Sequence, residues 1–285
     1  MGEIVVDMIT NKESFHKFIR YFGGSSANVA IHLANKGNEV YFAGTVGNDF
    51  LGEYLQQVLN NNNVNTTLLQ KSSKPTSIII INEDNNSPIP LFYKNADYFY
   101  YFTDELRAKI KDVDLIHVSA HALSMEPLRQ TVLETVQLGL DLHKIISFEP
   151  NFRSKINLDD KMYRKTVLNV LKHIDIVKPS LDDARNLFNE DLDSFEIITK
   201  FFDLGVKKVV ILTCGSKGVF FCSKDRNPEF LPVHPIENVA GVTGAGDAFW
   251  GGFLSHYIKE LNLKKAVQEG IESATEKIKH LGAIR

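Results

Sequence analysis

The sequence predicts an α/β fold in which helices cover both faces of a mostly parallel β-sheet. Short β-branched runs alternate with amphipathic stretches over most of the 285 residues. The runs are too uniformly apolar for strands with one solvated face, so they are typical of parallel strands buried on both sides. Strands and helices that alternate at this spacing imply right-handed crossovers and a three-layer domain.

The predicted strands are apolar runs of four to six residues, and the predicted helices lie between them. The expected strands are Ile4–Asp7, Val40–Gly44, Leu115–Ser119, Ile145–Phe148, Ile174–Val177 and Lys208–Thr213. The expected helices are Asn28–Lys36, Phe50–Asn61, Asp104–Lys111, Pro127–Leu142, Lys161–Lys172 and Glu196–Leu204. We expect these elements to form a single domain over residues 1–285.

Residues 8–22 and 65–100 break this alternation, because strand-like pieces follow one another there without a helix. Two such pieces are Ser77–Ile81, which contains four consecutive isoleucines, and Leu91–Lys94. An apolar run of this kind is unfavourable on an open sheet. We therefore expect a small second sheet that covers a site or a partner subunit. With the aromatic run Tyr98–Phe102, it holds more apolar surface than a solvated flap can expose, which predicts a homodimer through this sheet.

Composition and charge exclude several classes of protein. Hydrophobic residues make up 44% of the chain, enough for a large core. The 32 basic and 35 acidic residues give a net charge of −3, which argues against a nucleic-acid binder. No apolar run approaches the roughly 20 residues that cross a bilayer, and the start MGEIVVD lacks the basic region of a secretory signal. Cys214 and Cys222 fit neither a disulfide framework nor a zinc site, which favours a cytoplasmic protein with reduced thiols.

The segment Gly241–Phe253, GVTGAGDAFWGGF, has the strongest chemical signal. Gly244, Ala245 and Gly246 are small enough to let an anion approach the backbone N–H groups at the start of a helix. Asp247 in the same turn would repel a bound anion, but it suits a base that takes a proton from a nucleophile attacking a bound phosphate. An ordinary glycine-rich turn with aspartate as the N-cap is the alternative.

Two other glycine-containing segments are weaker signals. Gly23–Gly37 begins with a glycine pair before a helix that Ser25 or Ser26 would cap, and Asn28 would point from its first turn. Thr213–Gly218, TCGSKG, follows a buried strand and would open onto the ligand crevice of a parallel sheet. Each also fits a plain turn, before a helix or in a hairpin.

The sequence lacks two common nucleotide-binding motifs. It has no GxxxxGK[ST] loop, which excludes a P-loop enzyme, and no GxGxxG after the first strand, so nothing supports NAD binding.

Taken together and in this order, the segments resemble the PfkB, or ribokinase-like, family of sugar kinases. GGSSANVA and the following GTVGNDFLG are similar to the family's N-terminal signature, and TGAGDAFWGGF is similar to its C-terminal one. The resemblance runs from Gly2 to Ile284. Within the family, FYKNAD (92–97), HVSAHALSMEPLR (117–129), SFEPNFR (147–153) and DIVKPS (175–180) resemble pieces of fructokinases.

The resemblance implies a Rossmann-like domain with a β-sheet lid, the lid matching residues 8–22 and 65–100. It implies phosphorylation of a sugar hydroxyl with ATP and Mg²⁺. Asp247 would be the catalytic base, and an anion hole would follow Gly244, formed by the amides of Ala245, Gly246 and Asp247. The residues expected at the substrate are Asp7, Gly23, Gly24, Asn28, Lys94 and Arg153. Those expected near ATP are Lys178, Ser180, Thr213, Gly215 and Gly218, with Asp183 acting indirectly at Mg²⁺.

The chain departs from the family pattern at four places. Glu149 replaces the first residue of an Asp-Pro-Asn triplet, Asp183 replaces a glutamate, and Lys94 replaces an arginine; these three keep their charge. Gly241 replaces an acid that often helps to bind potassium in such kinases. A monovalent cation is therefore doubtful as a cofactor, and we expect activity to depend little on potassium.

The leading functional expectation is a fructokinase-like sugar kinase. A 2-keto-3-deoxygluconate kinase is the alternative within the class, because it shares the aromatic motif of the lid, and Arg153 or Lys94 could meet its carboxylate. A ribokinase-type activity is also open. Outside the enzyme class, a sugar- or nucleotide-binding protein that has lost catalysis is the alternative; the intact GAGD argues against it.

Overall fold

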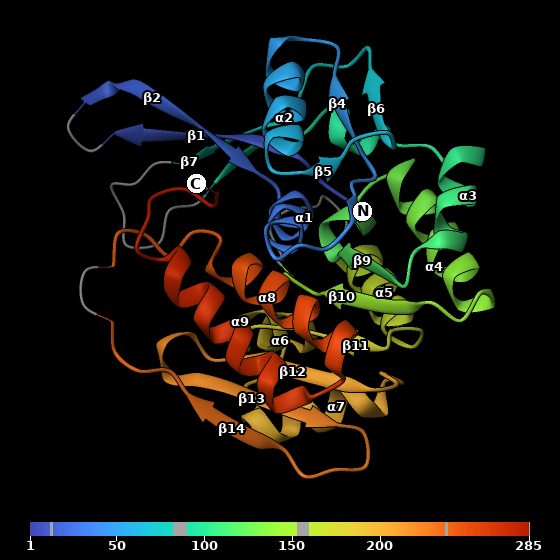
Figure 1. Ribbon diagram of the computed structural model, residues 1–285, viewed down its shortest axis with the longest axis vertical. Coiled ribbons are helices and arrows are strands. Elements are labelled where there is room, and N and C mark those ends of the chain that lie inside the picture. The colour runs from blue at the N-terminus through green and yellow to red at the C-terminus, as the bar shows by residue number, and fades with distance from the viewer. Residues whose placement is uncertain (12–13, 82–89, 153–159, 237–238, 285) are drawn as a thin grey trace.

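The largest sheet has six strands and runs from the middle of Figure 1 to its foot. This computed structural model describes residues 1–11, 14–81, 90–152, 160–236 and 239–284. The order is β14–β13–β12–β11–β10–β9, with bounds Glu229–Pro232, Gly218–Ser223, Val209–Thr213, Ile176–Val177, Ile145–Glu149 and Leu115–Ser119. The pairs from β9 to β12 are parallel, and β13 and β14 add on antiparallel. The predicted mostly parallel central sheet is therefore confirmed.

Helices cover both faces of this main sheet, as three layers require. Along β12, Val210 and Leu212 face one helical layer, whereas Val209 and Ile211 face the other. The first layer contains α3 (Asp104–Asp112), α4 (Leu128–Asp141), α5 (Asp160–Leu171), α6 (Leu181–Phe188) and α7 (Ser194–Asp203). The second contains α1 (Ser25–Asn35), α8 (Ala245–Glu260) and α9 (Leu263–Lys277), of which α8 and α9 lie in front of the sheet in Figure 1.

A second sheet of four strands lies beside the main one, in the order β2–β1–β7–β8. Its strands span Ser14–Gly23, Val5–Asn11, Ile78–Ile81 and Leu91–Tyr93. Strand β1 pairs antiparallel with β2 and parallel with β7. The expectation that Ile4–Asp7 belongs to the main sheet is wrong, because this strand continues to Asn11 and its described partners are β2 and β7.

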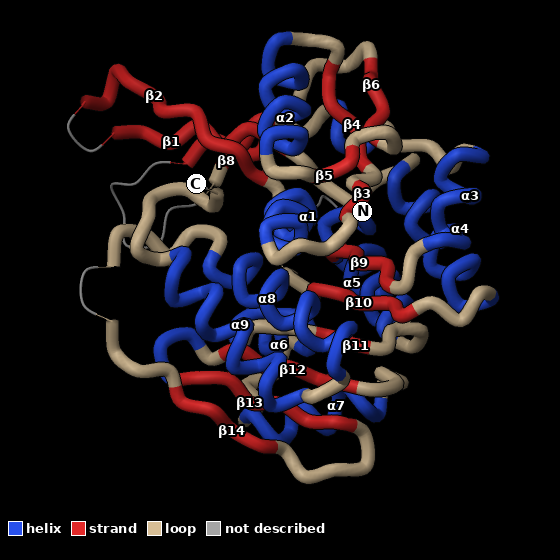
Figure 2. The backbone as a smooth tube through the Cα atoms, viewed as in Figure 1, coloured by secondary structure: helices blue, strands red, loops and turns tan. Residues whose placement is uncertain are grey.

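Two short parallel pairs are the remaining described strands; Figure 2 shows one pair near the top beside α2 (Phe50–Asn61) and the other below it, close to the N-terminus. They are β3 (Val40–Tyr41) with β5 (Val64–Asn65), and β4 (Gly44–Gly47) with β6 (Leu69–Ser72). The single strand expected over Val40–Gly44 is thus two strands with different partners. Strand β6 also shows that part of residues 65–100 lies outside the second sheet.

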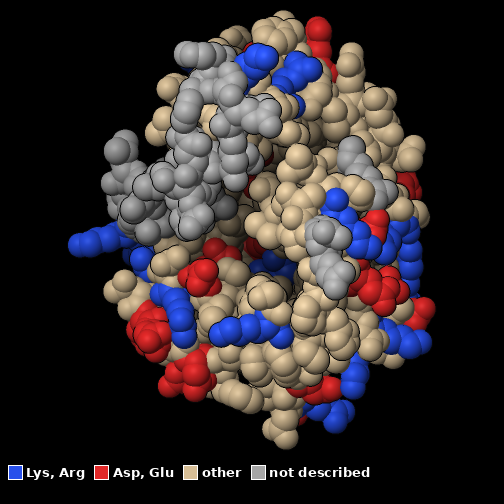
Figure 3. All heavy atoms as spheres, turned by 90° about the vertical axis from the view of Figure 1, so that its left-hand side faces the viewer, with Lys and Arg blue, Asp and Glu red and all other residues tan. Residues whose placement is uncertain are grey.

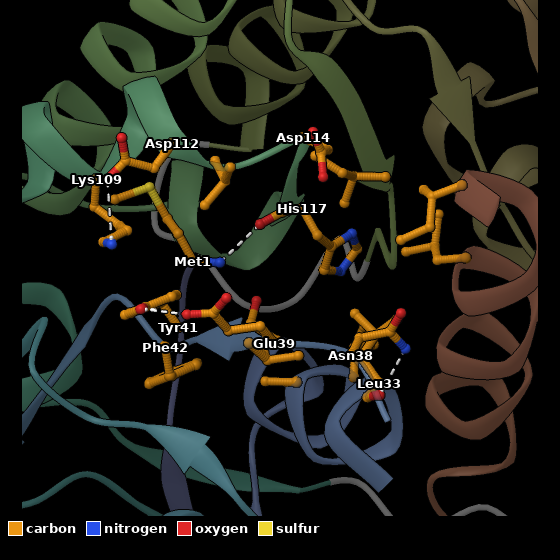
Figure 4. A pocket seen from close by; sticks show the side chains of 18 residues that line it. Met1, Leu33, Asn38, Glu39, Tyr41, Phe42, Lys109, Asp112, Asp114 and His117 are labelled. Atoms are coloured by element: carbon orange, nitrogen blue, oxygen red, sulfur yellow. Dashed lines mark hydrogen bonds and ion pairs between the residues drawn. The ribbon is translucent and has the colours of Figure 1, made fainter. Parts of the chain in front are cut away.

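A pocket of about 280 Å³ lies between β3 and β9, and Figure 4 shows it from close by. The amino group of Met1 donates to the carbonyl oxygen of His117 at 2.7 Å on its wall. The His117 ring accepts at Nδ1 from the indole N–H of Trp250 at 3.1 Å. Among the described residues, β9 therefore forms an edge of the main sheet, and this pocket separates it from β3.

Each of the six expected helices begins and ends within three residues of an observed helix. Phe50–Asn61 is confirmed at both ends, and the other five expected helices overlap observed ones. Helices α6 and α9 were not among the expected helices. No described helix is both long and apolar enough to cross a membrane.

Candidate active site

A pocket of about 460 Å³ lies where the main sheet, the second sheet and the first turns of α1 and α8 meet. It gathers most of the residues that the sequence singled out. The expected residues that line it are Asp7, Gly24, Asn28, Lys178, Ser180, Asp183, Thr213, Gly244, Gly246 and Asp247. In the space-filling view of Figure 3, one side of the molecule is hollowed, and both acidic and basic side chains lie in the hollow.

Asp247 lies in the first turn of α8, and both of its carboxylate oxygens are held by α1. Oδ1 accepts from the Ser25 hydroxyl at 2.7 Å, and Oδ2 accepts from the Asn28 amide at 2.8 Å. Gly244 is the N-cap, with a left-handed φ of 79°. A Cβ atom there would lie 2.7 Å from the Cα of Ala283, so only glycine fits. The alternative in which Asp247 is the N-cap is therefore wrong, because its carboxylate points into the pocket network.

The pKa of Asp247 is raised from its ordinary 3.8 to about 7. Burial is the largest cause, and repulsion from the Glu149 carboxylate adds to it. The hydrogen bonds from Asn28 and Ser25 and the charge of Lys178 lower it, but by less. A carboxyl group with a pKa near neutrality is well matched to accept a proton during catalysis.

Lys178 and Glu149 form a buried ion pair beside Asp247. The Lys178 ammonium group lies 2.5 Å from Glu149 Oε1, and both side chains are almost fully buried. The Ser25 hydroxyl also lies 3.2 Å from Glu149 Oε2, so it stands between the two carboxylates. A Cβ atom on Gly246 would lie 3.6 Å from the Lys178 ammonium group, which places the turn of α8 directly over this pair.

The glycine pair before α1 brings two backbones together. Gly24 is the N-cap of α1 with a φ of 101°, and a Cβ atom there would lie 2.6 Å from the carbonyl oxygen of Glu3. A Cβ atom on Gly23 would lie 2.5 Å from the Asp7 carboxylate, although Gly23 itself does not line the pocket. The expected capping by Ser25 or Ser26 is wrong: Ser26 donates to the Glu3 carboxylate at 3.1 Å instead.

Thr213 and Ser180 lie side by side at the carboxyl ends of β12 and β11, where their backbones form a bridge. Ser180 and Asp183 also form the capping box of α6, so local structure alone accounts for part of their arrangement. Gly215 lies in the turn between β12 and β13 and Gly218 begins β13, but neither lines the pocket. A Cβ atom on Gly218 would lie 2.3 Å from the Leu231 carbonyl oxygen, so pairing with β14 explains that glycine.

Three other predicted residues stand apart from the pocket wall. Lys94 lines a small neighbouring cavity with Phe92 and Asp97, and burial lowers the pKa of its amine. Ala245 does not line the pocket, and its backbone N–H donates to the carbonyl oxygen of Val242 at 3.1 Å. Arg153 lies outside the described residues.

The structure also adds residues that the sequence did not assign to the site. Ser25 connects α1 to Asp247 across 222 positions of sequence, so no local pattern could reveal it. Glu149 was noted only as a departure from a family pattern. The second sheet supplies Ile79, Ile81 and Phe92, which line the pocket as alternate apolar residues of β7 and β8.

The comparisons with known proteins point to carbohydrate kinases. Residues 1–285 match the model of the pfkB family carbohydrate kinase. The ATP-dependent 6-phosphofructokinase of Thermoanaerobacterium thermosaccharolyticum is 33% identical over 288 residues, covering 100% of this chain and 88% of that protein. The fructokinase of Vibrio alginolyticus is 30% identical over 261 residues, covering 89% and 81%.

Solved structures show the same likeness. The fructokinase of Halothermothrix orenii is 30% identical with a TM-score of 0.81, over 94% of this chain and 96% of that one. The fructokinase of Vibrio cholerae O395, in a form with bound fructose, ADP and calcium ion, has a TM-score of 0.85 over 99% and 92%. At 23% identity, that second structure supports the fold alone.

Proposed function

Because this chain belongs to the pfkB family of carbohydrate kinases, we propose that it transfers the γ-phosphoryl group of ATP to a hydroxyl group of fructose. The observation that carries the proposal is Asp247: a carboxyl group with a pKa of about 7, fixed at both oxygens and facing the pocket. The match to the family supports the coarser statement that the chain is a sugar kinase. The fructokinases at 30% identity support the choice of sugar.

In the proposed mechanism, Asp247 orients the sugar hydroxyl and accepts its proton as the oxygen bonds to phosphorus. Ser25 and Asn28 hold the carboxylate so that it need not reorganise during the reaction. The N–H groups of Gly246 and Asp247 have no backbone acceptor in the described chain, so they are available to the charge on the transferred phosphoryl group. Phosphoryl transfer depends mostly on such positioning and charge neutralisation.

The acidic and amide side chains that line the pocket fit a magnesium ion bound together with ATP. Glu149, Asn151 and Asp183 offer oxygen ligands of the type that Mg²⁺ prefers. The described residues contain no group of three or more acidic, histidine or cysteine side chains that could hold a metal ion by themselves. We infer that phosphate and water oxygens would supply most of the ligands of such an ion, and that it would neutralise charge on the phosphates.

We propose that the second sheet acts as the lid of this site. Ile79, Ile81 and Phe92 present an apolar surface to the pocket, which would exclude water as a competing acceptor. The remaining predicted binding roles also stay proposals: Asp7, Gly24 and Asn28 toward the sugar, and Lys178, Ser180 and Thr213 toward ATP.

A second candidate substrate is fructose 6-phosphate, favoured by the 33% identity to a 6-phosphofructokinase. The charges of the described pocket favour the neutral sugar instead. Five acidic side chains line the pocket: Glu3, Asp7, Glu149, Asp183 and Asp247. Lys178, the one lysine or arginine among the described lining residues, is already paired with Glu149. A phosphate on the substrate would need a further cation.

We also propose a homodimer through the second sheet. Four apolar side chains on its strands are exposed: Phe18 (47%), Ile19 (45%), Leu91 (58%) and Tyr93 (57%). The expected contribution of the run 98–102 is wrong for Tyr98 and Tyr100, which are both 1% exposed and pack within their own chain, whereas Tyr101 is 54% exposed. Both cysteines are free, as in the cytoplasmic protein that we propose.

The experiment that tests the substrate is a coupled assay of ADP release with ATP and Mg²⁺. Fructose and fructose 6-phosphate should be compared first, followed by ketodeoxygluconate, ribose, tagatose phosphate and adenosine. We expect the highest kcat/KM with fructose. A higher kcat/KM with fructose 6-phosphate would favour the second candidate. Binding of a sugar without ADP release would favour a protein that has lost catalysis.

A further inference from the structure

Helix α9 ends in a buried lysine whose ammonium group contacts the segment leading into the anion-binding turn. Lys277 is 8% exposed. Its Nζ donates to the carbonyl oxygens of Gly241 and His280, each at 3.2 Å. No described carboxylate lies within ion-pair distance of this Nζ. Lys178, the other lysine that is buried in the described chain, differs in being paired with Glu149.

Lys277 incurs the free-energy cost of burying a charged group. Burial lowers the pKa of Lys277, and the attraction of Asp247 partly restores it. Burying an ammonium group costs free energy, and its hydrogen bonds to the two carbonyl oxygens offset part of that cost while also satisfying those oxygens. The chain therefore places a positive charge where two backbone carbonyl oxygens converge, within the electrostatic influence of Asp247.

The segment from Ala240 to Gly244 makes further contacts with the residues at and after the end of α9. The N–H groups of Ala240 and Gly241 lie 2.9 and 3.3 Å from the carbonyl oxygen of Ile278. Gly244 lies against Ala283, and this close approach is possible only because glycine has no side chain. The turn that presents the N–H groups of α8 is thus supported by residues 277–283, with Lys277 as the charged member of that support.

The residues present do not fit the potassium ion that the family resemblance implies. Gly241 offers no carboxylate ligand, and its carbonyl oxygen already accepts from Lys277. An ion at this carbonyl would also lie close to a fixed ammonium group, and like charges repel strongly in a buried site.

We propose that the Lys277 ammonium group takes the place of a monovalent cation, holding the 241–244 turn in position for the anion hole. Lys277 is a positioning residue, since it acts through the turn and does not touch the reacting atoms. The proposal rests on the proposed kinase function, and it gives a structural cause for the expected weakness of any potassium effect.

The test replaces the built-in cation with an external one. Lys277→Ala removes the ammonium group and leaves both carbonyl oxygens in place. In tetramethylammonium buffer we expect its kcat to be at least about tenfold below that of the unaltered protein, and K⁺ or NH₄⁺ to restore most of the loss. The unaltered protein should respond less than about threefold to the same ions, because a tenfold effect corresponds to about 1.4 kcal/mol of stabilisation that its own lysine already supplies.

The matched control is Lys279→Ala, two residues further on. Lys279 is exposed and pairs with Glu276 at 2.9 Å, so its loss should change neither activity nor the response to K⁺. The double variant Gly241→Asp/Lys277→Ala should respond to K⁺ at a lower concentration, because it restores a carboxylate ligand. The side chain has room there, since a Cβ atom would meet nothing closer than Leu281 at 3.5 Å.

Thermal unfolding gives a readout that does not require turnover. K⁺ should raise the Tm of Lys277→Ala more than that of the unaltered protein, relative to tetramethylammonium. The proposal is overturned if Lys277→Ala keeps full activity in tetramethylammonium, if K⁺ rescues neither its activity nor its Tm, or if the unaltered protein is strongly activated by K⁺. If no sugar is phosphorylated by the unaltered protein, the kinase proposal fails separately, and the Tm comparison still tests the role of Lys277.

Discussion

Replacing Asp247 with asparagine is expected to remove activity and to stabilise the folded protein at alkaline pH. Asparagine keeps the size and reach of the side chain but cannot accept a proton from a sugar hydroxyl. General-base catalysis contributes about 10²–10⁴-fold, so kcat should fall by at least about 100-fold. The KM for ATP should change little, because the proposed proton transfer involves the sugar hydroxyl.

The stabilisation follows from the raised pKa of Asp247. The carboxyl group binds its proton more tightly in the folded protein, where its pKa is about 7, than in the unfolded chain. This contribution to stability is complete below about pH 4 and is lost as the pH rises through about 7. At about 1.4 kcal/mol for each pKa unit, the ionised carboxylate costs the folded state up to roughly 4 kcal/mol at alkaline pH.

Asparagine avoids that cost but loses part of the network. Its amide group donates where an aspartate oxygen accepted, so the hydrogen bond from Ser25 or from Asn28 is lost, at about 1–2 kcal/mol. The net gain should be about 2 kcal/mol at alkaline pH, or a few degrees in Tm for a chain of this size. Near pH 5 the gain should vanish, because the aspartate is then protonated and resembles the amide.

Thermal unfolding of both proteins at about pH 5 and about pH 8.5 measures this difference, and steady-state kinetics measures kcat. A Tm gain that is equal at both pH values, or absent at the higher one, would refute the raised pKa. A variant that retains more than a tenth of the original kcat would refute the assignment of the base. The unaltered enzyme should itself lose kcat as the pH falls through about 7, since the base must be ionised.

Three further predictions concern the surroundings of the base. Lys178→Met leaves Glu149 charged and buried without its partner, so stability should fall by about 3–5 kcal/mol; an unchanged Tm would show that the ion pair is unimportant. Gly23→Ala places a Cβ atom 2.5 Å from the carboxylate of Asp7, a proposed sugar-binding residue, so the KM for the sugar should rise several-fold while the KM for ATP stays unchanged. Equal increases in both KM values would contradict this prediction. Leu91→Lys, on the exposed second sheet, should convert a dimer to the 32.1 kDa monomer in sedimentation; a monomer before the change would contradict the dimer.

The layers of the main domain could be predicted because burial on both faces leaves a local trace in the sequence. Leu115–Ser119, with Leu115, Ile116 and Val118 as its apolar residues, was expected as a strand at its observed ends. The sequence of a strand does not show which sheet the strand joins, which is why Ile4–Asp7 was expected in the main sheet although it belongs to the second sheet. Helix α6 was not expected because it is only eight residues long, half of them polar, and its capping box depends on the unremarkable pair Ser180 and Asp183.

The site could be predicted where one short segment holds its parts together. Gly244, Gly246 and Asp247 act within a single turn, so their pattern is visible in sequence. The raised pKa of Asp247 depends on Glu149, almost a hundred positions away, and the hydrogen bonds come from α1 near the other end of the chain. Lys277 had no signal at all, since a lysine near a helix end is usually solvated, and only its burial against two carbonyl oxygens distinguishes it.

The most direct test of the central claim is the reaction itself, followed by ADP release and by mass spectrometry of the sugar. With ATP, Mg²⁺ and fructose, the unaltered protein should form ADP and fructose phosphate in equal amounts, and the Asp247→Asn variant should form neither at a comparable rate. Equal rates for the two proteins, or ADP formation without any phosphorylated sugar among the substrates tried, would contradict the account.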